Sequence, residues 1–399
     1  MSCGGNLTKR QACAIESAAK THPRRHIYVL FSSPVNEEIL MSRNLATLRL
    51  KRNIHYRRIH LEEYARATPL LHLVSRKVVY ESKWWVEHAA DVLKILTLFK
   101  YGEEEDALPS AEGVQFSPRP QSIFFHETSC RGSLTARQAC AIESAARANP
   151  QRDIYVLFSA PVNELMLTSG NLEKLKSLPN IKPARVHLAK YAKKTPLEEM
   201  VQSKPFETSK WWIEHTSDIL RSLTLFKFGG IYLDTDMLVV KSLTPLGPNW
   251  VAKEDNTLVN SAAIAISTDQ IGRRLANALI KELKTTYTPD IWIHNGPGAI
   301  TRVLVKFCKT RHANKWTSSS CNGLEVYSPE YFYPVYYNRC KVYFEPGELN
   351  TVTKNAYAYH LWNKLTHNMK IEKGSPLMGM AEEFCPSIFQ MYGDSFGDV

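Results

Sequence analysis

The sequence predicts an α/β protein, in which helices alternate with the strands of a mostly parallel sheet, preceded by a partial copy of the N-terminal part of the same fold. Three observations lead to this prediction. From residue 122 onward, apolar runs of strand length alternate with longer segments of helical period. Residues 230–236, GIYLDTD, end a predicted strand in two carboxylates. An ungapped internal repeat relates residues 3–102 to residues 130–229.

Each element has its own signal in the sequence. The runs SIFFHE (122–127) and DIYVLFS (153–159) have the apolar content of strands, and LTARQACAIESAARA (134–148) between them has a helical period. Residues 210–228 form a second helix, which Gly229-Gly230 closes with a C-cap and a tight turn into the next strand. The remaining expected elements are a short element at RVHLAKYA (185–192), strands near 250–253 and 262–266, helices near 271–285 and 298–309, and a late strand at AYAYHLW (356–362).

The internal repeat defines the predicted domains. About 57 of its 100 aligned positions are identical, and two long copies indicate a duplicated domain fragment because solenoids need three or more short repeats. The first copy lacks a counterpart of strand 122–127 and runs into Glu103-Glu104-Glu105 where the second continues into the acidic strand. We therefore expect an incomplete, inactive repeat over 1–102, an acidic, proline-containing linker over 103–121 and the complete domain over 122–399.

Composition excludes several classes of protein. The hydrophobic fraction of 44% and the charged fraction of 22% are those of an ordinary globular protein. No run approaches the length of an apolar membrane-spanning helix, and the first residues have no apolar core typical of a signal peptide. The net charge of +11 does not predict a nucleic-acid partner, because residues 1–102 account for +9 of it.

Eight cysteines, none of them in a Cys-x-x-Cys pair, leave two interpretations open. An even, scattered set is typical of disulfides formed in an oxidising lumen, and buried free thiols in a cytosolic protein are the alternative. The spacing of Cys3 and Cys13 returns as Cys130 and Cys140. On this basis we expect a Cys130–Cys140 disulfide.

The acidic strand is the main candidate for a functional site. Alternation places Ile231 and Leu233 on one face of the strand, with Tyr232 and Asp234 on the other. Asp234 and Asp236 then lie at the edge of the sheet, where open α/β folds bind ligands. Two hard oxygen ligands suit Mg²⁺ or Mn²⁺ with a diphosphate-bearing substrate, whereas an acidic turn is the plain alternative. The chain has no phosphate-binding Gly-rich loop and no Gly-x-Ser-x-Gly sequence.

The helix before this strand carries a second candidate pair. Asp218 and Arg221 fall on the face opposite Ile219 and Leu223. Such a pair is usually a weak surface salt bridge, but the helix leads directly into the acidic strand, so we also expect the pair near the site. The first copy keeps Asp91 but has Lys94 in place of Arg221, and lysine cannot reproduce a bidentate guanidinium contact.

Several blocks together resemble a known family. The run from Ser217 to Asp236 looks like the sugar-binding region of DXD-containing glycosyltransferases, and IWIHNGPGAITRV (291–303), YFYPV (331–335) and YHLWNK (359–364) are similar to the alpha-1,4-glycosyltransferase family. The resemblance covers about 122–390, in order. It implies a glycosyltransferase A-type fold, with 122–399 as the catalytic domain. It also implies retaining transfer of a hexose or N-acetylhexosamine from a UDP-sugar to a glycan acceptor in alpha-1,4 linkage, with Mn²⁺ and with a glycosphingolipid as the expected acceptor.

The resemblance also assigns roles to individual residues. Asp218 and Arg221 would hold donor hydroxyls, and Tyr232 would flank the nucleotide. The implied metal ligands are Asp236, Asp234 and His360, with Asp236 binding the metal directly. Asp234 would also contact the ribose or the sugar. His360 and Trp362 would close over the diphosphate. A packed strand histidine is the alternative for His360. Asn295 is expected to be catalytic, together with the two aspartates. The sequence here is Asn-Gly-Pro where the family has Gln-Gly-Pro, so the side-chain amide is kept on a shorter side chain.

Two further expectations follow from the resemblance. The family predicts a lumenal enzyme at the Golgi membrane, although no anchor is visible in the sequence. A non-catalytic carbohydrate- or partner-binding relative of the transferase is the alternative, and the intact Asp-Thr-Asp favours the enzyme. No residue is identified as a general base.

Overall fold

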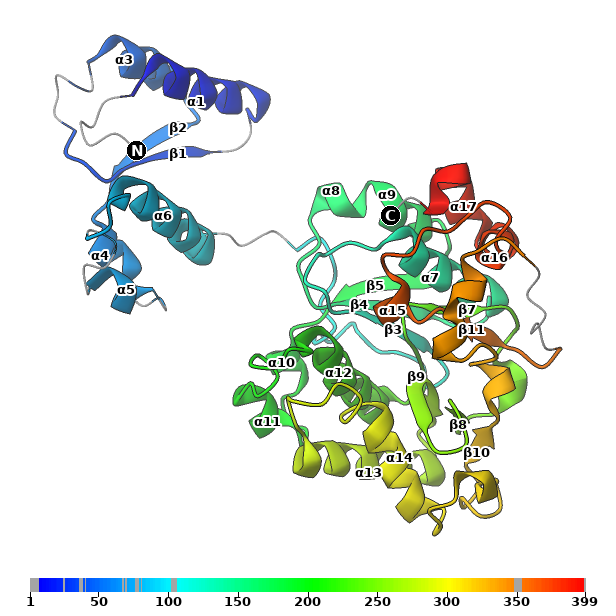
Figure 1. Cartoon of the computed structure of the whole chain (residues 1–399). Helices are drawn as coiled ribbons and strands as arrows, with labels where there is room; N and C mark the ends of the chain where they lie inside the picture. Colours follow the sequence, from blue (N-terminus) through cyan, green and yellow to red (C-terminus); the bar gives the residue numbers. More distant parts are fainter. Residues whose placement is uncertain are drawn as a thin grey trace. The chain divides into compact units, whose positions relative to one another are not determined.

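The computed structural model describes residues 7–23, 26–35, 39, 41–66, 68, 70–75, 79, 81–101, 106–347 and 354–397. The chain divides into two compact units, Met1–Glu103 and Glu104–Val399, which are described separately (Figure 1). The tripeptide Glu103-Glu104-Glu105 at the end of the first copy lies outside the described residues.

The second unit is built on a seven-stranded mixed sheet with the strand order β10-β8-β9-β6-β3-β4-β5. Every neighbouring pair is parallel except those made by β9, which runs antiparallel to both β6 and β8. The predicted α/β class is therefore confirmed. The strands are β3 (Ile123–Glu127), β4 (Ile154–Phe158), β5 (Ile181–Arg185), β6 (Gly230–Leu233), β8 (Trp250–Lys253), β9 (Val259–Ile266) and β10 (Glu325–Tyr327).

Helices cover both faces of this sheet, as Figure 1 shows. Ile231 and Leu233 of β6 share one buried cluster with residues of α7 (Ala136–Ala148). Tyr232 shares the other with residues of α12 (Trp212–Phe228), α13 (Gln270–Thr286) and α14 (Pro297–Phe307). The predicted alternation along the acidic strand is confirmed. The shorter helices are α8 (Glu164–Leu167), α9 (Gly170–Lys176), α10 (Leu188–Tyr191), α11 (Glu198–Gln202), α15 (Asn363–Thr366), α16 (Pro376–Phe384) and α17 (Pro386–Tyr392).

Local signals account for the ends of two helices that frame the site. Thr135 and Gln138 form a reciprocal capping box at the start of α7. Helix α12 ends at Gly229, whose φ of 65° is a left-handed conformation that glycine adopts without strain. A Cβ there would lie 2.7 Å from the carbonyl oxygen of Ile266, so the predicted Gly-Gly turn is also needed for close packing against β9.

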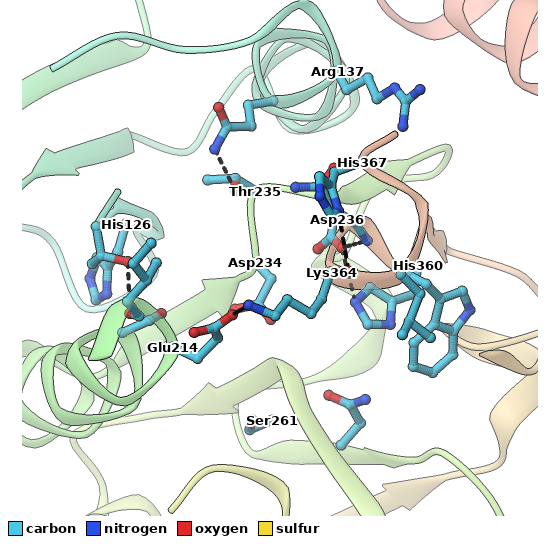
Figure 2. A pocket seen from close by; sticks show the side chains of 18 of the residues that line it. His126, Arg137, Glu214, Asp234, Thr235, Asp236, Ser261, His360, Lys364 and His367 are labelled. Atoms are coloured by element: carbon cyan, nitrogen blue, oxygen red, sulfur yellow. Dashed lines mark hydrogen bonds and ion pairs between the residues drawn. The ribbon is translucent and has the colours of Figure 1, made fainter. Parts of the chain in front are cut away.

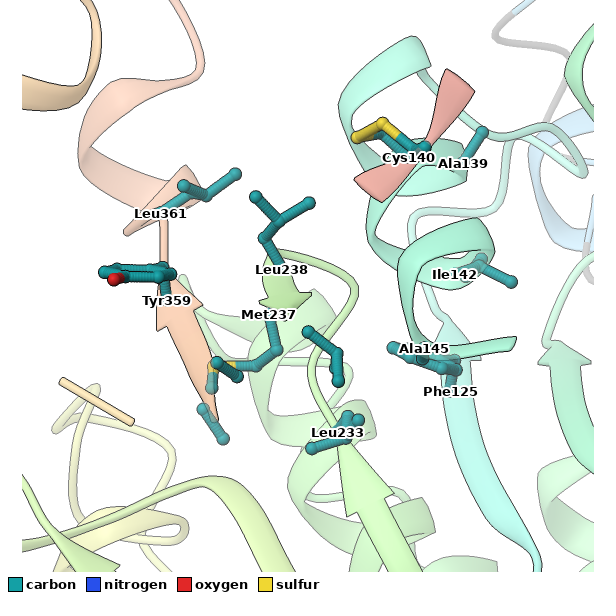
Figure 3. Close-up of a cluster of buried hydrophobic side chains, with 14 of the residues drawn as sticks. Phe125, Ala139, Cys140, Ile142, Ala145, Leu233, Met237, Leu238, Tyr359 and Leu361 are labelled. Carbon is teal, nitrogen blue, oxygen red and sulfur yellow. A yellow bond between two sulfur atoms is a disulfide. The ribbon is translucent and has the colours of Figure 1, made fainter. Parts of the chain in front are cut away.

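A separate two-stranded antiparallel sheet joins distant parts of the chain. β7 (Met237–Val239) pairs with β11 (Ala358–His360), and their side chains pack with those of α7 and β3 in one buried cluster (Figure 3). This pairing confirms the late strand expected at 356–362. The late strand is paired with β7, the strand that directly follows the Asp-Thr-Asp motif.

The expected Cys130–Cys140 disulfide is wrong. Cys140 is bonded to Cys385, at the junction of α16 and α17, and Cys308 is bonded to Cys321 (Figure 3 shows the bond at Cys140). Cys130 is a free, exposed thiol. Cys140 lies on α7, which packs against α16 and α17 on either side of Cys385, a proximity that sequence spacing cannot reveal.

Residues 106–121, the described part of the predicted linker 103–121, are packed into the second unit. Leu108 and Ala111 are buried in its two apolar clusters. The Arg185 guanidinium is 2.8 Å from a carboxylate oxygen of Asp106, and the Ala111 amide donates to the carbonyl oxygen of Arg185.

The first unit repeats part of this order of elements. Its parallel strands β1 (Ile27–Phe31) and β2 (Ile54–Arg58) correspond by the sequence repeat to β4 and β5. Its helices are α1 (Lys9–Thr21), α3 (Arg43–Arg49), α4 (Leu61–Ala65), α5 (Leu71–Ser75) and α6 (Trp85–Tyr101). On α6, Leu98 is 68% exposed, whereas its counterpart Leu225 on α12 is buried. That this unit arose by duplication and is inactive stays a prediction.

Candidate active site

A pocket of about 1270 Å³ opens at one edge of the seven-stranded sheet. The carboxyl ends of the parallel strands meet at this edge, so Glu127 at the end of β3, Asp234 after β6 and Glu254 after β8 all line the pocket. Strand β9 runs the other way, and for that reason Asn260 and Ser261, near its start, line the same pocket. Asp234 and Asp236 line this pocket at the sheet edge, where the sequence analysis placed them.

Three side chains in this pocket form a candidate metal site. Ligand atoms of Asp234, Asp236 and His360 all lie within 4.8 Å of one another (Figure 2). Pairing of β7 with β11 brings them together, because His360 is in register with Met237 and the Leu361 amide donates to the carbonyl oxygen of Asp236 at 3.0 Å. His360 is buried in strand β11, as the packed-histidine alternative expects, and it also lies within ligand distance of both aspartates.

Each carboxylate is oriented through a single oxygen. Asp236 Oδ2 accepts from the Asn363 amide at 2.7 Å and lies 3.3 Å from His360 Nε2. Asp234 Oδ1 accepts from the Tyr232 hydroxyl at 2.6 Å and from Arg221 at 3.1 Å. The second oxygen of each carboxylate, Asp236 Oδ1 and Asp234 Oδ2, takes no part in these contacts and is placed to bind a cation.

Asp236 and His360 shift the pKa of each other. Burial on its own raises the pKa of Asp236, but His360 and the Asn363 amide outweigh it and hold the pKa below its ordinary value. Burial likewise lowers the pKa of His360, and the neighbouring Asp236 more than reverses this. His360 Nδ1 is buried and has no hydrogen-bond partner among the described residues. Two carboxylates and an imidazole with unused ligand atoms fit a divalent cation.

Asp218 and Arg221 form a buried pair inside the pocket, so the surface salt-bridge interpretation is wrong. Their side chains are 8% and 7% exposed, and Arg221 donates to Asp218 as well as to Asp234. The guanidinium also lies over the Tyr232 ring, 4.5 Å from its centroid. Arg221 thereby ties helix α12 to the acidic strand end.

Comparison with known proteins decides the family. Residues 135–256 match the glycosyltransferase sugar-binding region that contains the DXD motif, and residues 268–392 match the alpha 1,4-glycosyltransferase conserved region. Lactosylceramide 4-alpha-galactosyltransferase of Mus musculus is 32% identical over 275 residues, which cover 67% of this chain and 75% of that protein. The chain belongs to the alpha-1,4-glycosyltransferase family.

More distant matches within and beyond the alpha-1,4-glycosyltransferase family are also found. Alpha-1,4-N-acetylglucosaminyltransferase of Homo sapiens is 23% identical over 281 residues, covering 68% of this chain and 80% of that protein. The crystal structure of the galactosyltransferase LgtC with donor and acceptor sugar analogues shares 14% identity, covers 68% of this chain and 96% of that chain, and has a TM-score of 0.37. A score this low does not by itself establish a shared fold. The names of the two relatives differ in the sugar, so family membership leaves the sugar undetermined.

Trp362 packs against His360 directly after β11. Its φ of 56° is left-handed, its indole donates to the carbonyl oxygen of Val335 at 2.9 Å, and its ring centroid is 4.1 Å from that of His360. The ring lines the pocket beside the candidate metal site. It packs on one side of His360 and so restricts the orientation of the imidazole.

Asn295 does not line the pocket. It is buried, and both ends of its amide bond the backbone of Thr288, at 3.1 Å and 2.7 Å. The following Gly296 lies directly behind Asp218, because a Cβ there would be 2.4 Å from Asp218 Oδ1. Within the described residues, Asn295 holds a turn that supports the site from behind.

Sequence reasoning missed several residues of the site. Glu254 has a raised pKa because it is buried, and its carboxylate accepts from Asn260 at 2.7 Å. Glu254 follows a predicted strand just as Asp234 does, and that signal was available. Glu127 Oε2 and His126 Nδ1, at the end of β3, are buried without a partner in the described part of the chain. Burial lowers the pKa of His126 to about 3, so its ring is neutral.

The segment after β11 forms one wall of the pocket. Arg137 of α7 donates to the carbonyl oxygens of Thr366 and Met369, and Lys364 reaches across to Glu214 of α12 (Figure 2). Lys364 also lies over the Trp211 ring. No sequence pattern indicated these contacts, since each joins residues that are distant in the chain.

Proposed function

We propose that the protein is a retaining, metal-dependent transferase that moves a hexose or N-acetylhexosamine from a UDP-sugar to a glycan acceptor in alpha-1,4 linkage. One observation supports this most: the ligand cluster of Asp234, Asp236 and His360 inside a large pocket of an alpha-1,4-glycosyltransferase family member. Mn²⁺ is the proposed cation. When bound, a divalent cation would supply positive charge that neutralises the departing diphosphate.

The residues of this chain prepare that site before any ligand arrives. Tyr232 and Arg221 fix Asp234, while Asn363 and His360 fix Asp236. Preorganised groups of this kind stabilise developing charge without reorganising during the reaction. Trp362 and His360 together close one side of the pocket and limit access of water.

The donor contacts are proposed from what remains free in the pocket. Asp218 is placed to accept hydrogen bonds from sugar hydroxyls, with Arg221 behind it as a positioning residue. Glu127 and His126 offer buried, unpaired polar atoms where a nucleoside could bind. Asn295 is proposed to act by holding the 295–297 turn, since its amide is already used by Thr288.

The fold type, the acceptor and the cellular compartment are each proposed on a separate ground. The mixed sheet, with the DXD motif at the carboxyl end of its interior strand β6, supports a glycosyltransferase A-type fold. The name of the murine relative supports a glycosphingolipid acceptor. Two disulfides support an oxidising lumen, as in the Golgi apparatus. No helix in the described part of the chain is both long and apolar enough to cross a membrane.

The test is a donor and acceptor screen with the full chain. UDP-galactose, UDP-N-acetylgalactosamine and UDP-N-acetylglucosamine are each incubated with simple glycosides and with a glycosphingolipid, after chelation and after return of Mn²⁺ or Mg²⁺. We expect one donor to be consumed only with added metal, and NMR of the product to show an alpha-1,4 linkage. Binding of UDP-sugar without any turnover, by a folded protein, would instead identify the non-catalytic relative.

A further inference from the structure

The pocket extends to both sides of the candidate metal site. Asp234 follows β6, which lies between β9 and β3 in the sheet. Glu254 after β8 and Asn260 near the start of β9 are therefore on one side of it, and Glu127 at the end of β3 is on the other. The β3 side is the one proposed above for the nucleoside. The opposite side, which we call the β8 side, remains for a second ligand.

Aromatic rings form a wall of the pocket on the β8 side. Tyr336, Tyr337 and Trp362 all line the pocket, and the Tyr336 hydroxyl donates to Asp255, the residue after Glu254, at 3.1 Å. The Tyr337 ring centroid is 4.4 Å from that of Tyr336 and 6.1 Å from that of Trp362. Tyr337 is nevertheless 43% exposed. Its ring is thus held between two neighbours and still presents open surface to the pocket.

An exposed aromatic ring inside a pocket suits the apolar face of a sugar. In the described part of the second unit, Trp212 and Tyr337 are the most exposed aromatic residues, and Trp212 does not line the pocket. The face of an aromatic ring carries partial negative charge, whereas the C–H hydrogens on one face of a pyranose ring are partly positive. A sugar ring can therefore stack on Tyr337 and keep its hydroxyls directed elsewhere.

The β8 side also offers a hydrogen-bond acceptor for a hydroxyl. Glu254 lines the pocket but is only 8% exposed. Its Oε2 accepts from Asn260 at 2.7 Å, and its Oε1 has no hydrogen-bond partner among the described residues. A nearly buried oxygen without a partner is costly, and a ligand hydroxyl would satisfy it. The carboxyl groups of Glu254 and Asp255 disfavour a phosphate here, so the β8 side suits a neutral sugar better than a further part of the donor.

We propose that Tyr337 and Glu254 select the acceptor: the Tyr337 ring stacks on the apolar face of its terminal sugar, and Glu254 Oε1 accepts a hydrogen bond from one of its hydroxyls. This proposal rests on the proposed function, since it assigns the acceptor to the same pocket. In a galactoside the hydrogens on C3, C4 and C5 share one face, opposite the axial O4. Stacking of that face on Tyr337 turns O4, the hydroxyl that an alpha-1,4 linkage uses, away from the wall.

The test of the stacking contact measures acceptor binding without transfer. Methyl β-lactoside, or methyl β-cellobioside with its equatorial terminal O4, is titrated into the full chain saturated with UDP and Mn²⁺, and saturation-transfer NMR detects the sugar protons in contact. We expect tighter binding of the lactoside, with the strongest signals from C3, C4 and C5 of galactose. Tyr337→Ala should weaken this binding about fivefold, whereas Tyr337→Phe keeps the ring face and should retain it. Tyr28→Ala, at an exposed tyrosine of the first unit, is the control.

The hydroxyl contact is tested with monodeoxy derivatives of the lactoside. The parent should bind one of them about tenfold more weakly or worse, because Oε1 of Glu254 then faces no hydroxyl. Glu254→Ala should bind the lactoside weakly and lose this difference between the two sugars. Glu254→Gln keeps the volume of the side chain if the alanine variant does not fold, and it should reduce the difference.

Separate readouts distinguish this proposal from the function itself. Calorimetric titration with UDP and Mn²⁺ should give parent-like affinities for the Tyr337 and Glu254 variants. Loss of Mn²⁺ affinity in Glu254→Gln would place Glu254 with the metal ligands and overturn the proposal, as would lactoside binding that is absent from the parent or unchanged by Tyr337→Ala. If the parent binds lactoside as expected but transfers no sugar, the proposed function fails and the acceptor contacts stand. If it transfers sugar and both alanine variants keep the parent KM for acceptor, only this proposal fails.

Discussion

His360 Nε2 lies 3.3 Å from Asp236 Oδ2, although the two residues are far apart in the sequence. The antiparallel pairing of β7 with β11 produces this contact, because it aligns His360 with the residue that follows the Asp-Thr-Asp motif. The same pairing presents the Asn363 amide to the same carboxylate oxygen. The candidate metal site is therefore a property of two strands, and mutations on either strand should affect it.

Asp236→Asn should remove most metal-dependent transfer while the fold persists. The amide fills the same volume but supplies no negative charge to a cation, and we expect at least a hundredfold loss of kcat/KM. Steady-state transfer at saturating Mn²⁺, together with thermal unfolding, measures both effects. Asp394→Asn, at an exposed carboxylate near the C-terminus, is the control. Equal rates for the Asp236 variant and the parent would remove Asp236 from the site.

Tyr232→Phe should weaken metal binding without removing a ligand. The lost hydroxyl donates to Asp234 at 2.6 Å, and loss of such an orienting partner typically costs about 10- to 100-fold in metal affinity. Calorimetric titration with Mn²⁺ gives the dissociation constant directly. Tyr327→Phe loses a comparable bond, to the carbonyl oxygen of Leu246, and should bind metal as the parent does. An unchanged dissociation constant for Tyr232→Phe would show that this bond does not support the site.

The disulfides should be Cys140–Cys385 and Cys308–Cys321. Peptide mapping under non-reducing conditions is expected to find both, with Cys130 open to alkylation. Cys385→Ser should lower the free energy of unfolding by about 2–4 kcal/mol, because it releases the C-terminal helices from α7. Cys130→Ser should have little effect on stability. A Cys130–Cys140 peptide in the native protein would contradict this arrangement.

Glu282 should make stability depend on pH in the acidic range. Burial raises the pKa of this carboxyl, but Lys306 and Arg302 lower it by more, so its folded-state pKa lies below the ordinary value. The free energy of unfolding that ionised Glu282 contributes is therefore fully present above the unfolded-state pKa of about 4.3. It is lost as pH falls through the folded-state pKa. Glu282→Gln should cost about 1–3 kcal/mol at neutral pH, with a gap to the parent that closes in acid. Urea unfolding across this range measures the gap, and a gap independent of pH would refute the ion-pair explanation.

The two units should differ in donor binding. A fragment that starts at residue 104 is expected to fold and to bind UDP with Mn²⁺, whereas residues 1–103 should bind none, since Lys94 replaces Arg221 and the two aspartates have no counterpart. A fragment that starts at residue 121 should be less stable, because it loses buried Leu108 and the Asp106–Arg185 ion pair. Calorimetry of each fragment is the measurement. Binding by 1–103, or its loss from a well-folded 104–399, would show that the first unit completes the site.

The sequence by itself determined the local features of this protein. Periodicity located the long helices α7, α12, α13 and α14 and the strands β3, β4, β6, β8 and β9, but not β7, β10, α16 or α17. The Gly-Gly turn and the alternation along 230–234 placed Asp234 at the sheet edge. These features depend on backbone sterics and on which side chains leave water, and both act over a few residues.

Tertiary structure alone decided which distant residues meet. The partners of Asp236, the burial of Asp218 and Arg221, the pairing of Cys140 with Cys385 and the use of Asn295 as a support all depend on contacts between segments separated by many residues. Asn260 and Ser261 were missed for a related reason, since they reach the pocket only because β9 runs antiparallel. Strand direction and long-range pairing are set by packing of the whole core, and no short stretch of sequence carries that information.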